Sequence, residues 1–340
     1  MGFGKNRHGG VDMRRIIGSW GDQVWLTVIM VVVVFMSMFI APSALSIAGL
    51  SSMSVYGVEI GLVAFGEMMV ILSGDGGIDL SVGAMFALSQ VILGVLVLHG
   101  FNLWLSILAA IGAGMMLGLI NGILITRTKI PAIIATLGTM YAYGGLALVL
   151  THGVDISPFP SSFDLIGQGI IAGWPVQLVL IYVPIALILA MVLDRTAFGW
   201  KLYLVGTNAL AAALAGISVT RTRMAAYVTT GLLCAMSGVI DASRLVTARP
   251  DAGSTMNLAA ITIAVLGGTK LQGGEGRLGG TILATLVITW LSYSFGLANI
   301  NSVYEGGTIG IVLLLAIAAQ QGTRLSAVVQ RVLQRGQQNV

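Results

Sequence analysis

Long continuous runs of apolar residues dominate the chain. A helix needs roughly 20 predominantly apolar residues to cross the hydrocarbon core of a bilayer, which is about 30 Å thick. A transmembrane β-strand would instead alternate in polarity over about ten residues, and runs such as 24–41 do not. We therefore predict an all-α integral membrane bundle of about ten transmembrane helices. The segments are 24–41, 56–72, 80–98, 103–125, 131–150, 176–193, 224–243, 256–268, 280–297 and 306–320.

Glycine-rich and polar connections separate these segments. The stretch 73–79 holds several glycines, so we do not expect a helix to cross it undisturbed. The segment 256–268 is short, and we expect it to tilt, break or extend into its neighbours. The connection 151–175 contains three prolines, whereas 194–223 is amphipathic around an alanine-rich centre at 209–215. We predict one or two short cytoplasmic surface helices in 194–223; the alternative is a plain linker.

Composition supports the membrane assignment. Charged residues make up 9% of the 340 residues, whereas a soluble domain carries about 25%. Hydrophobic residues reach 56%, which excludes a disordered chain. The 46 glycines fit a bundle in which helices approach one another closely.

The basic residues predict an orientation, because they gather on the cytoplasmic side of membrane proteins. With a cytoplasmic N-terminus and ten spans, only Arg244 and Arg249 of the 17 Lys and Arg would lie outside. We thus predict a basic N-terminal arm (1–23), a transmembrane domain (24–320) with a cytoplasmic loop at 194–223, and a tail (321–340). Both termini would be cytoplasmic. The basic charge balance then reflects topology rather than nucleic-acid binding.

The sequence lacks the patterns of an enzyme. No phosphate-binding G-x-x-x-x-G-K-[ST] loop occurs, and the nearest stretch, 267–270, has the wrong spacing. We therefore expect no ATPase site and no cofactor in this chain. Cys234 is the only cysteine and lies in an apolar run, so we expect a buried packing residue and no cysteine-based metal site.

Charged residues within spans are costly and are therefore candidate functional groups. Asp241 and Arg244 are three positions apart on one helix face, where they could form a structural ion pair. Glu59 is expected near the outer interface. Glu67 lies deeper, and we expect it either to form hydrogen bonds within the bundle or to line a water-filled path.

Three motifs go beyond composition: GGIDLSVG at 76–83, KIPAIIATLGT at 129–139 and AVLGGTKLQGG at 264–274. In this order and spacing they resemble the membrane subunit of bacterial ABC importers of the ribose, xylose and autoinducer-2 type. The resemblance covers about 45–320. It implies a multi-pass permease of the bacterial inner membrane that works with a second copy or a paralogue. Two separate subunits would hydrolyse ATP with Mg²⁺, and a periplasmic sugar-binding protein would dock outside.

The resemblance also implies a cytoplasmic coupling helix that fits a groove on the ATPase. The matching segment is 206–217. Many relatives carry an acid and a base where this chain has Leu210 and Ala213, so we expect packing rather than charge to dominate the contact. The expected coupling residues are Gly206, Asn208, Leu210, Ala213 and Gly216.

These inferences predict a permease subunit that imports a monosaccharide or related polyol by alternating access. Which sugar is carried, and whether the partner is a copy or a paralogue, stay open. The competing hypotheses are a secondary transporter that couples protons through Glu67 and, less well supported, an intramembrane enzyme. Polar residues near span ends or in glycine-broken turns are the path candidates: Asp79, Ser81, Asn121, Thr136 and Thr139, with Glu67.

Overall fold

The computed structural model describes residues 30–31, 34–35, 46–128, 130–157, 159–301 and 303–318. The expected N-terminal arm (1–23), the tail (321–340) and most of the first expected span (24–41) lie outside the described residues.

The nine expected segments from residue 56 onwards all form helices. Among the described residues, six helical spans are long and apolar enough to cross a membrane: α2, α4, α5, the η3–α7 pair, α10 and α12. The shorter helices are α3, α11 and Val303–Ala318. The bounds are α2 (Ile47–Leu72), α3 (Val82–Leu98), α4 (Leu103–Thr128), α5 (Ala132–Thr151), π-helical η3 (Gln177–Tyr182), α7 (Val183–Arg195), α10 (Val219–Leu245), α11 (Met256–Leu266) and α12 (Leu278–Leu297).

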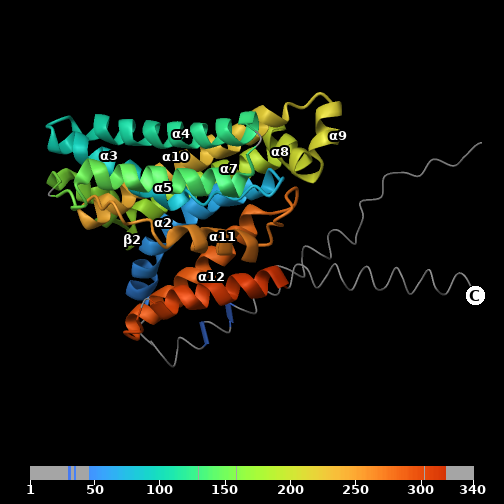
Figure 1. Cartoon of the computed structure of the whole chain (residues 1–340). Helices are drawn as coiled ribbons and strands as arrows, with labels where there is room; N and C mark the ends of the chain where they lie inside the picture. Colours follow the sequence, from blue (N-terminus) through green and yellow to red (C-terminus); the bar gives the residue numbers. More distant parts are fainter. Residues whose placement is uncertain are drawn as a thin grey trace, which may run out of the picture.

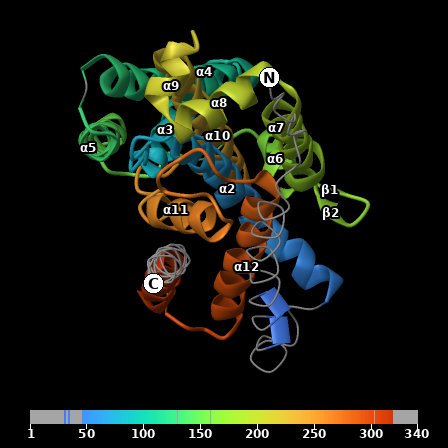
Figure 2. The ribbon, with the colours of Figure 1, turned by 90° about the vertical axis from the view of Figure 1, so that its right-hand side faces the viewer.

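Helix α10 lies at the centre of the bundle. It contacts α4, α2 and α3, while α11 and α12 pack on the other side of α2. Figure 2 shows α10 and α2 between α5 on one side and α7 on the other. Glycines permit the closest approach, because Gly231 on α10 faces Gly114 and Gly118 on α4 at positions where a side chain would collide with backbone.

Helix α2 begins nine residues earlier than the hydropathy pattern predicted. Ser46 caps it, accepting a hydrogen bond from the Gly49 amide at 2.9 Å. The first turns contain serines that lower the hydropathy without preventing a helix. The break at 73–79 is confirmed: α2 ends at Leu72, and α3 begins only at Val82.

The two long connections contain short elements. Residues 151–175 hold a 3-10 turn η2 (Ser161–Phe163), α6 (Asp164–Gln168) and an antiparallel hairpin of β1 (Ile170–Ile171) and β2 (Trp174–Pro175). The connection 194–223 forms two short helices, α8 (Ala197–Thr207) and α9 (Ala209–Leu214), as predicted. Figure 1 shows α8 and α9 at one end of the bundle.

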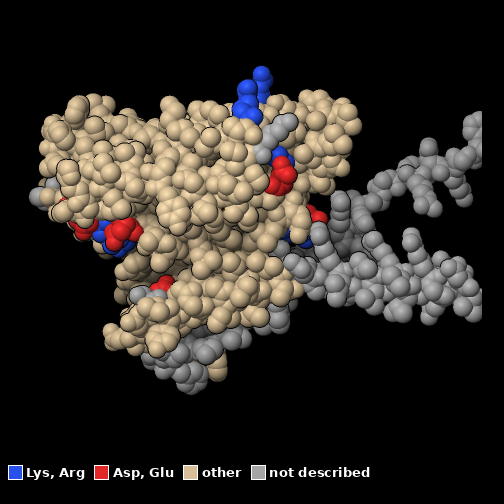
Figure 3. Space-filling model, viewed as in Figure 1, with Lys and Arg blue, Asp and Glu red and all other residues tan. Residues whose placement is uncertain are grey.

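The outer surface of the bundle is largely uncharged. Figure 3 shows charged side chains in a few small groups with wide uncharged areas between them. Large apolar side chains point outward from the outer helices, for example Leu187 and Met191 on α7, each 64% exposed. Exposure of so many apolar side chains to water would be unfavourable, whereas contact with lipid suits them.

Candidate functional site: two buried polar networks and a coupling segment

Three helices and the turn after α2 bring one set of polar side chains together in the bundle interior. We call Glu67 (α2), Asp79 and Ser81 (the turn), Asn121 (α4) and Tyr143 (α5) the Asp79 cluster. The first four are fully buried, and Tyr143 is 6% exposed. The glycine-rich turn has this position because α2 must end before the chain can fold back into the bundle. Gly74, Asp75 and Gly76 all have positive φ there.

Hydrogen bonds connect the Asp79 cluster. The Asp79 amide donates to Glu67 Oε1 at 3.1 Å, and Asp79 Oδ1 accepts from the Ser81 hydroxyl at 2.6 Å. The Asn121 amide donates to Asp79 Oδ2 at 3.2 Å and to Ser81 Oγ at 2.7 Å. The Tyr143 hydroxyl donates to Asn121 Oδ1 at 3.2 Å. The cluster therefore ties α2, α4 and α5 to the turn.

Neither carboxylate of this cluster forms an ion pair within the described part of the chain. A buried carboxyl group without a cation depends on its hydrogen bonds, because its transfer from water is costly. Glu67 Oε2 has no hydrogen-bond partner among the described residues. The cluster is consequently sensitive to any change in its donors.

The remaining path candidates adjoin the cluster on α5. The Thr136 hydroxyl donates to the Ile78 carbonyl at 3.1 Å, and the Thr139 hydroxyl donates to the Thr136 carbonyl at 3.2 Å. Thr136 is fully buried and Thr139 is 8% exposed. The structure thus brings all six candidates together but encloses them, so their exposure to a path stays a prediction. Tyr143 joins them through its hydrogen bond to Asn121.

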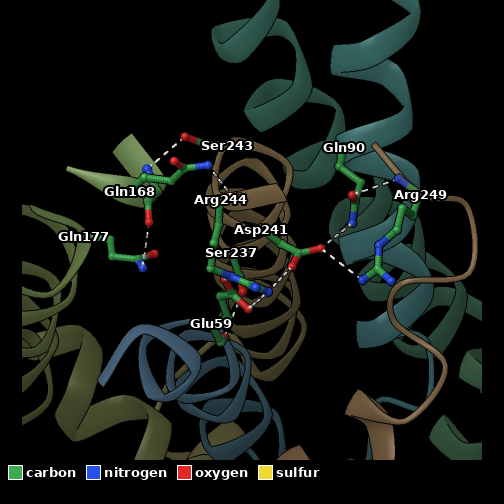
Figure 4. Close-up of polar contacts among 10 residues, drawn as sticks. Glu59, Gln90, Gln168, Gln177, Ser237, Asp241, Ser243, Arg244 and Arg249 are labelled. Atoms are coloured by element: carbon green, nitrogen blue, oxygen red, sulfur yellow. Dashed lines mark hydrogen bonds and ion pairs between the residues drawn. The ribbon is translucent and has the colours of Figure 1, made fainter. Parts of the chain in front are cut away.

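A second network lies towards the other end of α10 (Figure 4). Arg244 donates to both oxygens of Glu59, at 2.6 and 3.1 Å, and to Asp241 at 2.6 Å. Arg249 approaches Asp241 at 3.7 Å, and its amide donates to Gln90 at 3.0 Å. The predicted Asp241–Arg244 pair is confirmed. We call these five residues the Arg244 network.

The sequence pattern did not predict the extent of the Arg244 network. Glu59, expected at the outer interface, is 4% exposed and lies inside the bundle because α10 supplies Arg244 as its partner. Gln90 could have indicated the network, because a fully buried amide in an apolar span needs hydrogen-bond partners. Arg249 offered none, because it lies in the loop after α10.

In the expected coupling segment, 206–217, one side is packed and the other is exposed. Asn208 caps α9 by accepting from the Ala211 amide at 2.9 Å, and Gly216, at φ +81°, follows its end. Ala212 packs against Val205 and Ile217 on the inner side. Ala213 is exposed on the other face, together with Leu210 and Leu214, which are 72% and 82% exposed.

Gly206 belongs to a close backbone junction with Gly74, Gly273 and Gly274, which we call the glycine junction. A methyl group at Gly206 would collide with the Leu72 carbonyl and the Gly274 amide. The Gly274 amide itself donates to the Leu72 carbonyl at 3.0 Å. The end of α8, the end of α2 and the loop between α11 and α12 therefore meet without intervening side chains.

Two further contacts lie beside the glycine junction. Tyr203 on α8 donates to the Gly276 carbonyl at 3.0 Å, and burial raises the pKa of this phenol, which favours the protonated donor. Arg223 on α10 pairs with Asp75 at 2.7 Å and donates to the Ser73 carbonyl at 3.3 Å. The first contact holds α8 to the loop between α11 and α12, and the second holds the start of α10 to the turn that carries Asp79.

Comparison with known proteins gives a consistent picture. The ribose import permease protein RbsC of Bacillus subtilis is 40% identical over 259 residues, covering 76% of this chain and 80% of its own. The fructose import permease protein FrcC of Rhizobium meliloti is 34% identical, covering 78% and 75%. The autoinducer 2 import system permease protein LsrC of an Enterobacter strain is 35% identical, covering 74% and 73%. No solved structure matches the chain.

A family description also matches most of the chain. Residues 49–317 match the family described as "Branched-chain amino acid transport system / permease component". This range contains both buried networks, α8, α9 and the glycine junction. The chain belongs to this family of membrane permease components.

Proposed function

We propose that the chain is the transmembrane permease subunit of an ATP-driven importer for a monosaccharide or a related polyol. Relatives whose names specify ribose, fructose and autoinducer 2 import support this class of substrate. The observation that carries the proposal is the exposed tip of α9, joined through the glycine junction to the turn of the Asp79 cluster. This connection between α9 and the turn would transmit movement from a separate ATPase into the bundle.

The proposed subunit spans the bacterial inner membrane ten times, with both termini in the cytoplasm. The domain limits are those given above: the arm 1–23, the transmembrane domain 24–320 and the tail 321–340. Arg221 and Arg223 begin α10, and Lys201 lies on the neighbouring α8, so several basic residues gather at the end that this orientation places in the cytoplasm. Thr126, next to Arg127 on α4, borders the same cavity as Arg223.

The proposed partners follow from the surfaces. Two ATPase subunits would bind Leu210 and Leu214, and they, not this chain, would hold ATP and Mg²⁺. A sugar-binding protein would dock at the outer end. A second permease copy or a paralogue would cover part of the apolar face of α5, where Ile134 and Tyr141 are 62% and 72% exposed. Lipid would cover the remainder.

In this proposal the sugar passes beside the Asp79 cluster when the bundle opens. Differential contacts in the two states, rather than tight binding of the sugar, would drive alternation. The alternative is a proton-coupled transporter based on Glu67, which is buried and has one unpartnered oxygen within the described residues.

The deciding experiment is purification of the tagged chain in mild detergent from its own host, followed by uptake in proteoliposomes. We expect an ATPase to co-purify near stoichiometry, and labelled sugar uptake to require ATP and the binding protein. Uptake by the chain alone, driven by a proton gradient and indifferent to ATP, would establish the alternative instead.

A further inference from the structure

A polar cavity of about 370 Å³ lies between α4, α5, α10 and the turn after α2. It is at the end of the bundle where α10 begins with Arg221 and Arg223. Its size falls within the range of pockets that hold small organic molecules. Apolar walls come from Ile125 and Ile130. The polar side chains that line it are Ser73, Asp75, Thr126, Thr220, Arg223 and Tyr227.

One polar atom of this lining has no partner. Tyr227 is 1% exposed, and its hydroxyl forms no hydrogen bond within the described part of the chain. A buried hydroxyl without a partner is unfavourable and is uncommon in folded proteins. Tyr227 lines the cavity but its hydroxyl has almost no accessible surface, so a bound molecule with its own hydroxyl group would supply the missing partner after a small shift of the surrounding side chains.

The charges of the other lining residues indicate what net charge the bound molecule would have. Among the described residues of the lining, Arg223 is the one cation and Asp75 the one anion, and because they pair with each other they favour neither sign. The Ser73 and Thr126 hydroxyls donate to the Val70 and Gly122 carbonyls, at 2.7 and 2.6 Å, which leaves their oxygens as acceptors. A ligand that offers several hydroxyls as both donors and acceptors fits this set.

The cavity is also next to the Asp79 cluster. Ser73, Asp75 and Gly77 of the lining belong to the turn that carries Asp79, and Ala132 belongs to the first turn of α5, which Thr136 joins to the Ile78 carbonyl. Asp75 is 74% exposed at its side chain, so the cavity reaches the surface. The cavity therefore lies beside the turn that carries Asp79 and opens at the surface, although no residue of the Asp79 cluster lines it.

We propose that this cavity is a binding subsite for a neutral polyhydroxylated molecule, occupied on the cytoplasmic side as the sugar leaves the path. The inference rests on the proposed function for the identity of the ligand. The cavity lies within a single copy of the chain, so each permease copy would bind one molecule. The Tyr227 hydroxyl would bind the ligand directly.

The test uses the permease with its ATPase subunits in nanodiscs, without the sugar-binding protein. Binding of D-ribose and of D-fructose is measured by saturation-transfer difference NMR. We expect Tyr227→Phe to weaken binding about three- to tenfold, the loss of one hydrogen bond. Thermal stability should not fall, because the removed hydroxyl has no hydrogen-bond partner among the described residues. Thr126→Val should weaken binding in the same direction.

The matched control is Tyr304→Phe, which removes a hydroxyl from a side chain that is 68% exposed and lies outside the cavity. Equal affinity of the Tyr227→Phe, Tyr304→Phe and parent complexes would overturn the inference, as would stronger competition by inorganic phosphate than by a second sugar. Absence of saturable binding of both sugars would also overturn it. ATP-driven uptake, measured separately on the same complex, decides the proposed function, so the two can fail independently.

Discussion

Arg244 on α10 donates to both carboxylate oxygens of Glu59 on α2, which lies 185 positions earlier in the chain. The same guanidinium bonds Asp241 and lies 4.9 Å from the centre of the Tyr56 ring. A bidentate pair of this kind fixes orientation as well as distance. The Arg244 network therefore sets how the two central helices face each other.

Replacing Arg244 should destabilise the bundle strongly. Arg244→Gln leaves Glu59 and Asp241 buried with their main cation removed, and the loss of one partner from a buried pair costs about 3–5 kcal/mol. Thermal unfolding in detergent should show a clear fall in the midpoint. Arg221→Gln, at an exposed position of the same helix, should change it little. A triple change of Glu59, Asp241 and Arg244 to Gln, Asn and Gln should recover part of the loss, and equal midpoints for all variants would contradict this role.

Asn121→Asp should disrupt the Asp79 cluster. The side chain would lose the amide that donates to Asp79 and Ser81 and would bring a third carboxyl group beside Glu67 and Asp79. We expect lower stability, by about 2–4 kcal/mol, and at least tenfold lower uptake. Asn102→Asp is the matched control, because Asn102 accepts from the first amides of α4 at an exposed position where Asp serves equally well. Normal uptake by Asn121→Asp would show that the cluster is not part of the working mechanism.

Glu67→Gln distinguishes the two transport mechanisms. Glu67 Oε1 accepts from the Asp79 amide, and a glutamine oxygen can accept the same bond. ATP-driven uptake should therefore stay within about twofold of the parent, since a single neutral hydrogen bond is retained. Uptake at several pH values is the measurement. Abolished uptake together with a lost pH dependence would favour proton coupling through Glu67.

Gly206→Ala should weaken the link between α8 and the bundle. The new methyl group would meet backbone atoms of Leu72 and Gly274, which cannot rotate away as a side chain would. We expect a loss of about 1–3 kcal/mol from overpacking and a lower uptake per ATP hydrolysed. Gly112→Ala on α4, which would meet no atom within 4 Å, should be neutral or slightly stabilising. Equal behaviour of the two variants would contradict the close junction.

Leu210→Ser should weaken ATPase binding without affecting the fold. Leu210 is 72% exposed, so its removal costs little in the isolated chain. If it is an anchor in the ATPase groove, truncation should cost about 1–2 kcal/mol, or roughly five- to thirtyfold in affinity. The readout is the amount of ATPase recovered with the tagged chain. The control is Leu98→Ser, a leucine 68% exposed at the C-terminal end of α3; the same recovery for both variants would remove Leu210 from the interface.

Hydropathy predicted most helices because an apolar side chain must face either lipid or the bundle interior, and both lead to the same pattern. It could not predict which helices meet, so the pairing of Glu59 with Arg244 was missed although Asp241–Arg244 was found. The start of α2 at Ile47 was missed because serines lower hydropathy without breaking a helix. The path candidates are polar residues within apolar segments. Buried polar groups need hydrogen-bond partners, and this requirement brings these residues together in the fold.

The composition of α10 has a consequence for how the protein is made. Its apolar window has a mean hydropathy of 1.4, the lowest of the six long spans. Asp and Arg each oppose entry of a helix into the membrane by about 2.5–3.5 kcal/mol at its centre, and by less towards its ends. Glu59 on α2 and Gln90 on α3 are synthesised long before Asp241 and Arg244. Glu59 and Gln90 therefore enter the membrane first. When α10 is inserted, Asp241 and Arg244 find these polar partners already in place.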